Sequence, residues 1–351
     1  MQKGTSAGLG SGRRPTLRPV KKTLALTASA VLLAVAIAAS AYFLLIERGG
    51  LPDDPILIAP EDTSVILRAD VKRVVRSEVF QKLVEGRGLD AAVKELAEEC
   101  GYDFVRAVDE LFVFVRPEGE ANTIALVGAG RFDVEAASRC FKTRMESDAS
   151  LELEEMTLEG FRALGHESIR ARVAFVGSRG IVLGEEPMVI DILKRVRGEI
   201  PRLDKDSHLA KLYRRMSPRR DLVLAAELPK GWHLAAHDVL EPRHAYELAP
   251  TLMHLHEFGL GLTLREELSF GSVLVFDEEA ESARAHEAAE RTLDAMKKNF
   301  FLSLTPVAPA LAAIQLEREG KEVRVGLELT AEQIADVARV AKALGEDDEK
   351  E

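Results

Sequence analysis

The sequence predicts an α+β protein with antiparallel sheets, helices on one face and two tandem similar halves, preceded by one N-terminal transmembrane helix. Short β-type runs come in adjacent pairs, amphipathic helical patterns separate those pairs, and the second half repeats the order of the first. Paired strands favour hairpins over a doubly wound parallel fold. Hydrophobic residues make up 46% of the 351 residues and charged residues 30%, which is a globular composition.

The chain begins with a basic tail followed by an uncharged apolar segment. Residues 1–22 carry six basic side chains and no acidic one, and residues 23–46 contain no charge, proline or glycine. As a helix these 24 residues would span about 36 Å, more than the roughly 30 Å hydrocarbon core of a bilayer. Because basic flanks favour the cytoplasmic side, we expect a single-pass bacterial inner-membrane protein with a cytoplasmic N-terminus and a periplasmic C-terminal body.

A cleaved signal peptide is the alternative, since Ala39-Ser40-Ala41 would suit a signal peptidase. Cleavage after Ala41 would leave five apolar residues, Tyr42 to Ile46, at the new N-terminus, which favours the uncleaved anchor. Six of the 47 basic residues precede the span, so the body carries 41 basic and 58 acidic side chains, a net charge of -17. This charge disfavours nucleic acid and anionic headgroups as partners.

The first repeat is expected over residues 61–203, after a linker rich in glycine and proline at 47–60. Alternating and β-branched runs predict strands at 64–69, 111–116, 123–129, 172–176 and 180–183. One helix is expected where Leu89, Ala92, Val93, Leu96 and Cys100 share a face. Asp133 is placed to cap a second helix that runs to about Met145. A third follows the last strand, with Val189, Ile192, Leu193 and Val196 inside.

The second repeat is expected over residues 204–345, followed by an acidic tail at 346–351. The segments FDVEAAS (132–138) and FDEEAES (276–282) agree at five of seven positions, so we expect Asp277 to cap a helix as Asp133 does. This half should end in a hairpin, with strands at 313–316 and 322–327, and a helix. Thr330 and Gln333 have the spacing of that helix's capping box. A duplication is favoured over the chance similarity of two generic α+β segments.

The catalytic motifs that the sequence suggests fail on inspection. The segment IALVGAGRFD (124–133) has two glycines of a dinucleotide-binding loop, but Asp133 stands where a third Gly or Ala is needed and would repel phosphates. The sequence contains no P-loop, and its one Gly-x-Ser-x-Gly run, at residues 4–8, lies in the basic tail and not after a predicted strand, so it is no nucleophile elbow. We therefore expect no enzyme activity, no catalytic residue and no cofactor.

Five of the eight histidines lie in one short window, and His233, His237 and His244 are the candidate metal ligands. His233 and His237 are four residues apart, so they would share one face of a helix and could bind one metal ion. A metalloprotease has Glu directly after the first His, and Leu234 stands there. A metal site and a solvated surface helix are both open interpretations.

Cys100 and Cys140 are the two cysteines, and both fall on or near the inner faces of predicted helices. Export would place them in an oxidising compartment, where a disulfide forms and persists. The bridge would close a loop of about 40 residues and stabilise the fold by roughly 4 kcal/mol. Two buried thiols that pack as small hydrophobes are the alternative.

Three segments carry a resemblance to other proteins: PEDTSVILRADVKRV (60–74), GAGRFD (128–133) and GSRGIVLGEEPMVIDIL (177–193). Through them the chain resembles uncharacterised bacterial exported proteins with a basic tail, one anchor helix and a repeated α+β ectodomain. The resemblance covers about residues 60–345 and implies a fold, with no activity or site residue attached.

These observations lead to one functional hypothesis and two alternatives. We expect a non-enzymatic, membrane-tethered periplasmic binding or scaffolding module whose partner is an envelope protein or a small apolar ligand. The alternatives are a carrier or sensor of an apolar ligand held between sheet and helices, and a metal-binding protein that uses the histidine window.

Overall fold

The computed structural model describes residues 50–84, 89–118, 121–229, 252–303, 305, 307–334 and 336. These residues belong to one compact unit, Gly50–Glu351. No helix in this described part of the chain is both long and apolar enough to cross a membrane. The predicted anchor at residues 23–46 lies outside the described residues and remains a prediction.

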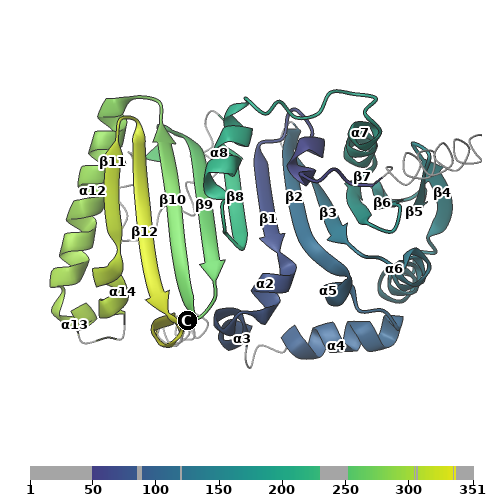
Figure 1. Cartoon of the computed structure of the whole chain (residues 1–351), viewed down its shortest axis with the longest axis horizontal. Helices are drawn as coiled ribbons and strands as arrows, with labels where there is room; N and C mark the ends of the chain where they lie inside the picture. The colour runs from purple at the N-terminus through teal and green to yellow at the C-terminus, as the bar shows by residue number, and fades with distance from the viewer. Residues whose placement is uncertain are drawn as a thin grey trace, which may run out of the picture. The chain divides into compact units, whose positions relative to one another are not determined.

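Twelve strands form one antiparallel sheet (Figure 1). From edge to edge the order is β11-β12-β10-β9-β8-β1-β2-β3-β7-β6-β5-β4. The strands are β1 (Val65–Asp70), β2 (Val108–Glu118), β3 (Ala121–Gly130), β4 (Glu154–Leu158), β5 (Phe161–Gly165), β6 (Ala171–Val176), β7 (Gly180–Glu185), β8 (Leu222–Glu227), β9 (Leu255–Leu264), β10 (Glu267–Phe276), β11 (Gln315–Glu319) and β12 (Glu322–Thr330). The prediction of an antiparallel α+β fold is therefore confirmed.

The helices connect these strands and differ widely in length. They are η1 (Pro55–Ile58), α2 (Val71–Arg76), α3 (Glu78–Val84), α4 (Leu89–Cys100), α5 (Phe104–Ala107), α6 (Val134–Ala149), α7 (Glu186–Arg197), α8 (His208–Met216), α12 (Glu279–Lys298), α13 (Phe300–Ser303) and α14 (Ala308–Ala313). A further helical turn at 331–334 follows β12.

Two of the three predicted helix caps are present. The Asp133 carboxylate accepts a hydrogen bond from the Ala136 N–H at 3.0 Å. Thr330 and Gln333 form a reciprocal capping box at 2.8 and 3.3 Å. The prediction for Asp277 is wrong, because Glu278 is the N-cap of α12 and makes no side-chain cap hydrogen bond. The helix α12 therefore starts later, at Glu279.

Helices cover both faces of the sheet, so the prediction of helices on one face is wrong. On the face that we name the core face, Ile66 and Val182 belong to the main cluster, together with residues of α7 and α8. On the opposite face, named the second face, Phe175 and Ile181 pack with residues of α6. The physical reason lies in strands such as β6, whose last four residues are all buried. Strand residues that are buried on both faces, as these are, require cover on both sides.

The predicted linker at 47–60 contains part of the core. Ile56, Ile58 and Ala59 are fully buried, and the Leu203 N–H donates to the Leu57 carbonyl at 3.0 Å. The prolines of this segment are compatible with the short 3-10 turn η1, because proline suits the first turn of a helix.

The strand order β1-β2-β3-β7-β6 of residues 61–203 has a counterpart, β8-β9-β10-β12-β11, in residues 204–345. The two segments share one sheet through the pairing of β1 with β8, and the main cluster takes residues from both. The hairpin β4–β5 has no counterpart in residues 204–345 of the described sheet and was not predicted from the sequence.

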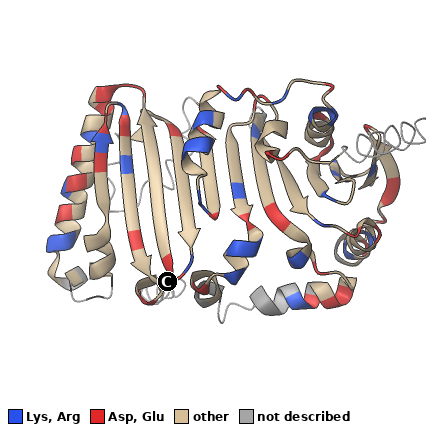
Figure 2. Ribbon diagram, viewed as in Figure 1, with Lys and Arg blue, Asp and Glu red and all other residues tan. Residues whose placement is uncertain are grey.

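The edge strands β4 and β11 carry exposed glutamates, including Glu154, Glu155 and Glu317 (Figure 2). Charge on an edge strand discourages pairing with another chain. In the acidic run at 152–155 the three glutamates are exposed and Leu153 is buried, and the last two residues belong to β4.

Candidate binding surface

The central strands carry apolar side chains that belong to no core cluster of the described residues. Cross-strand partners in an antiparallel sheet point to the same face, and the register places this set on the second face. We name it the apolar strip: Val65, Leu67, Val113, Val115, Ile124, Leu126, Leu224, Phe258, Leu260, Leu262 and Phe270. Ile124 is 48% exposed, and the others are half-buried.

One row of side chains crosses seven strands of the second face without a charged group. It consists of Leu183, Leu126, Val113, Leu67, Leu224, Leu260 and Ser272, one residue each from β7, β3, β2, β1, β8, β9 and β10. With strands about 4.8 Å apart, the row is about 29 Å long. Ser272 is its single polar member, so the row offers almost no hydrogen-bonding group to a ligand.

The alternate residues of the same strands form the main core on the core face. Ile66, Phe112, Phe114 and Val223 are at most 1% exposed and pack in the main cluster. The two faces of the central strands therefore differ: one is closed, and the other leaves its apolar side chains half-buried, with Ile124 exposed.

The helix α8 closes the core face over the junction of the two predicted halves. Tyr213 is buried in the main cluster, and this burial raises the pKa of its phenol. The Leu209 N–H donates to the Glu227 carboxylate at 2.9 Å. Arg215 donates hydrogen bonds to Glu322, which lowers the pKa of that carboxyl group. Both apolar and polar contacts hold α8 to the sheet.

Helices flank the apolar strip on the second face. On one side Ala137 of α6 packs with Phe175 of β6. On the other side Ala285 of α12 packs with Phe276 and Val323. Figure 1 shows α12 beside β11 and α6 beside the β4–β7 side of the sheet. The apolar strip occupies the strands between these two helices.

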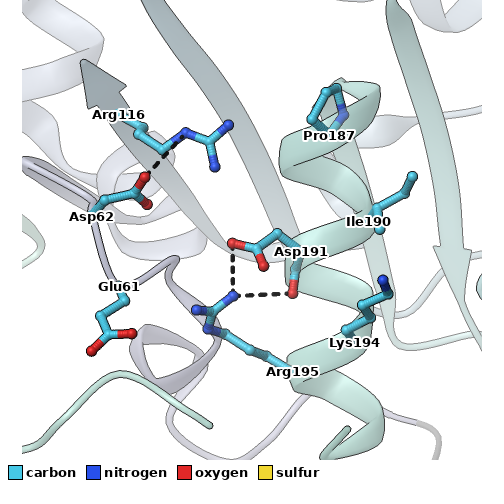
Figure 3. Close-up of a pocket in the computed structure, with 8 residues that line it drawn as sticks. All are labelled: Glu61, Asp62, Arg116, Pro187, Ile190, Asp191, Lys194 and Arg195. Carbon is cyan, nitrogen blue, oxygen red and sulfur yellow. Dashed lines mark hydrogen bonds and ion pairs between the residues drawn. The ribbon is translucent and has the colours of Figure 1, made fainter. Parts of the chain in front are cut away.

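A charged pocket lies on α7, near the end of β2 (Figure 3). Its volume is about 610 Å³, and it is lined by Glu61, Asp62, Arg116, Pro187, Ile190, Asp191, Lys194 and Arg195.

The basic groups of this pocket already have acidic partners. An Arg195 Nη1 lies 2.7 Å from the Asp191 carboxylate, and the Arg116 Nε lies 3.6 Å from Asp62. The Lys194 ammonium lies 3.7 Å from Glu159. An ionic ligand would have to displace one of these internal pairs, so the apolar strip is the stronger candidate.

The predicted metal ligands His233, His237 and His244 lie outside the described residues, and the metal site remains a prediction. Elsewhere, the Nδ1 of His208 lies 2.9 Å from the Oε1 of Glu257, and the Nε2 of His256 lies 3.3 Å from the same oxygen. Within the described ranges, no three His, Cys, Asp or Glu side chains are arranged to hold a metal ion.

Cys100 of α4 and Cys140 of α6 form a disulfide, with their Cα atoms 4.7 Å apart. Cys140 is 2% exposed. The bridge fastens α4 to α6, which covers the second face beside the apolar strip.

The glycine pair of the rejected nucleotide motif lies in β3. A Cβ atom on Gly130 would overlap the carbonyl oxygen of Ala107, so the backbone approach itself requires glycine there. Asp133 is engaged in capping α6. These residues have a structural role in the strand-to-helix connection.

Comparisons with known proteins give weak similarities. No family model matches the chain. No curated protein matches it either. Three solved crystal forms of a protein named TP0453 are similar. Form III shares 14% identity, covers 82% of this chain and 99% of its own, with a TM-score of 0.49. Form IV shares 15% identity, covers 81% of this chain and 96% of its own, and has a TM-score of 0.46. Form I shares 14% identity, covers 82% of this chain and 97% of its own, and has a TM-score of 0.45. This weak resemblance assigns no function.

Proposed function

We propose that the protein is a non-enzymatic binding module, tethered to the periplasmic side of the bacterial inner membrane by residues 23–46, and that the apolar strip is its binding surface. The observation that carries the proposal is the strip itself, a set of apolar side chains that belong to no core cluster of the described residues. Apolar surface that the fold leaves partly open to water is characteristic of interaction sites. Its ligand is a small apolar molecule, because the strip offers no charge.

Two further observations support this proposal. The disulfide between Cys100 and Cys140 is of a kind that persists in oxidising compartments such as the periplasm. The repeated strand order agrees with two tandem similar halves. In that arrangement the strip crosses their junction, where Leu67 of β1 pairs with Leu224 of β8.

The absence of titratable side chains from the apolar strip supports binding over catalysis. General acid–base and nucleophilic chemistry need ionisable or hydroxyl groups at the reacting atoms. The strip consists of Val, Leu, Ile and Phe alone.

We expect Leu67→Asp to weaken the binding of the neutral apolar dye N-phenyl-1-naphthylamine at least about tenfold, because a carboxylate in the middle of the strip must lose water when the dye binds. Residues 50–351 suit this experiment, since all four core clusters and the disulfide lie within them. Binding is measured by fluorescence titration of the folded fragment.

Met296→Asp is the matched control. Met296 lies on α12, is 39% exposed and lies outside the apolar strip. This variant should bind the dye as the wild type does, and a thermal melt of each variant confirms that it is folded. Equal binding by both variants, or no saturable binding by the wild type, would contradict the proposal.

A further inference from the structure

We infer, building on the proposed function, that the ligand of the apolar strip is the acyl chain of a membrane lipid. The chemistry of the strip is the first argument. Its side chains are hydrocarbon, and its backbone groups are paired with neighbouring strands. A protein partner forms about one hydrogen bond per 100–200 Å² of interface, and the strip has no side-chain group for such bonds. A hydrocarbon chain needs no hydrogen bond from the surface that binds it.

The length of the strip is the second argument. The part of the row that belongs to the strip, from Leu126 to Leu260, crosses five strands and is about 19 Å long at about 4.8 Å per strand. A bilayer core of about 30 Å holds two leaflets, so one acyl chain in a leaflet extends about 15 Å. The row is therefore long enough to contact an extended acyl chain from one end of that chain to the other.

The short tether is the third argument. Four residues separate Ile46, the end of the predicted anchor, from Leu51. Leu51 packs against the main cluster and lies so close to Gly180 that a Cβ there would be 2.7 Å from the Leu51 Cγ. Ile46 and Leu51 are five residue steps apart, so an extended chain between them spans about 18 Å at most. Leu51 lies on the core face, opposite the strip, and the tether keeps a bilayer within reach of the folded body, which raises the effective concentration of lipid.

Charge indicates which part of the lipid is recognised. No cationic side chain belongs to the apolar strip, and the body beyond the anchor carries a net charge of -17. An acidic body gains nothing from an anionic headgroup. Recognition through the chain alone predicts uptake of zwitterionic lipids that is at least as efficient as uptake of anionic ones.

The test uses the full chain in phosphatidylcholine vesicles that contain a small fraction of phosphatidylcholine with a diazirine at the end of one acyl chain. After illumination, we expect labels on strip residues such as Leu67, Val113 and Leu224, in addition to residues 23–46. Core-face neighbours such as Ile66 and Phe114 should stay unlabelled. Mass spectrometry of proteolytic peptides locates each label.

Variants make this experiment decisive. Leu67→Asp should lower labelling of the strands at least about fivefold and leave labelling of residues 23–46 unchanged, while Met296→Asp should lower neither. The inference is overturned if the wild-type label is confined to residues 23–46, or if strand labelling requires phosphatidylglycerol. If labelling of the strands fails but the fragment still binds the dye, the proposed function stands. If both labelling of the strands and dye binding fail, the proposed function is overturned as well.

Discussion

Phe114→Ala is expected to lower the free energy of unfolding by about 3–5 kcal/mol, and Val113→Ala by about 1 kcal/mol. Phe114 is fully buried on the core face, where its ring centroid lies 6.3 Å from that of Phe112. Val113, one residue earlier, points to the second face and is half-buried in the apolar strip. Truncating a side chain that water already reaches creates no closed cavity.

Urea unfolding of residues 50–351 measures this pair of variants. The midpoint should shift strongly for Phe114→Ala and little for Val113→Ala, with an unchanged dependence of the free energy on urea concentration. Similar losses at both positions would mean that Val113 is a core residue, and the apolar strip would then not be an open surface.

Replacing both cysteines, as Cys100→Ala with Cys140→Ala, is expected to lower the free energy of unfolding by about 4 kcal/mol. The bridge joins residues separated by 40 positions, so its loss frees a long loop in the unfolded chain. In the native state it fastens α4 to α6. The effect should appear as a lower urea midpoint under oxidising conditions.

A reducing agent provides the control for the disulfide. Dithiothreitol should lower the wild-type midpoint toward that of the double variant and leave the midpoint of the double variant unchanged. A wild type that is insensitive to reduction, and equal in stability to the double variant, would show that the bridge does not stabilise this fold.

The local features of the fold were predictable because they depend on residues close in sequence. Asp133 caps α6 through an N–H three residues away, and the Thr330–Gln333 capping box has the same reach. Asp277 has a similar local sequence and does not cap, because α12 begins one residue later, with Glu278 as its N-cap. A similar local sequence is thus not enough to fix where α12 begins.

The apolar strip was partly visible in the sequence. The run Leu111–Val115 is apolar at every position, and strands of that kind are apolar on both faces. What the sequence could not provide is the pairing of β1 with β8, which sets Leu67 beside Leu224 from a distant part of the chain. A shift of one residue in that register would move the strip residues of the shifted strand to the core face.

Native mass spectrometry of residues 50–351, purified from the periplasm of producing cells without delipidation, tests the central claim most directly. We predict an apolar molecule of lipid mass bound to the wild type and to Met296→Asp. It should be released on denaturation and should be absent from folded Leu224→Asp. A bare chain in all three samples would contradict the account, as would an adduct that Leu224→Asp retains in full.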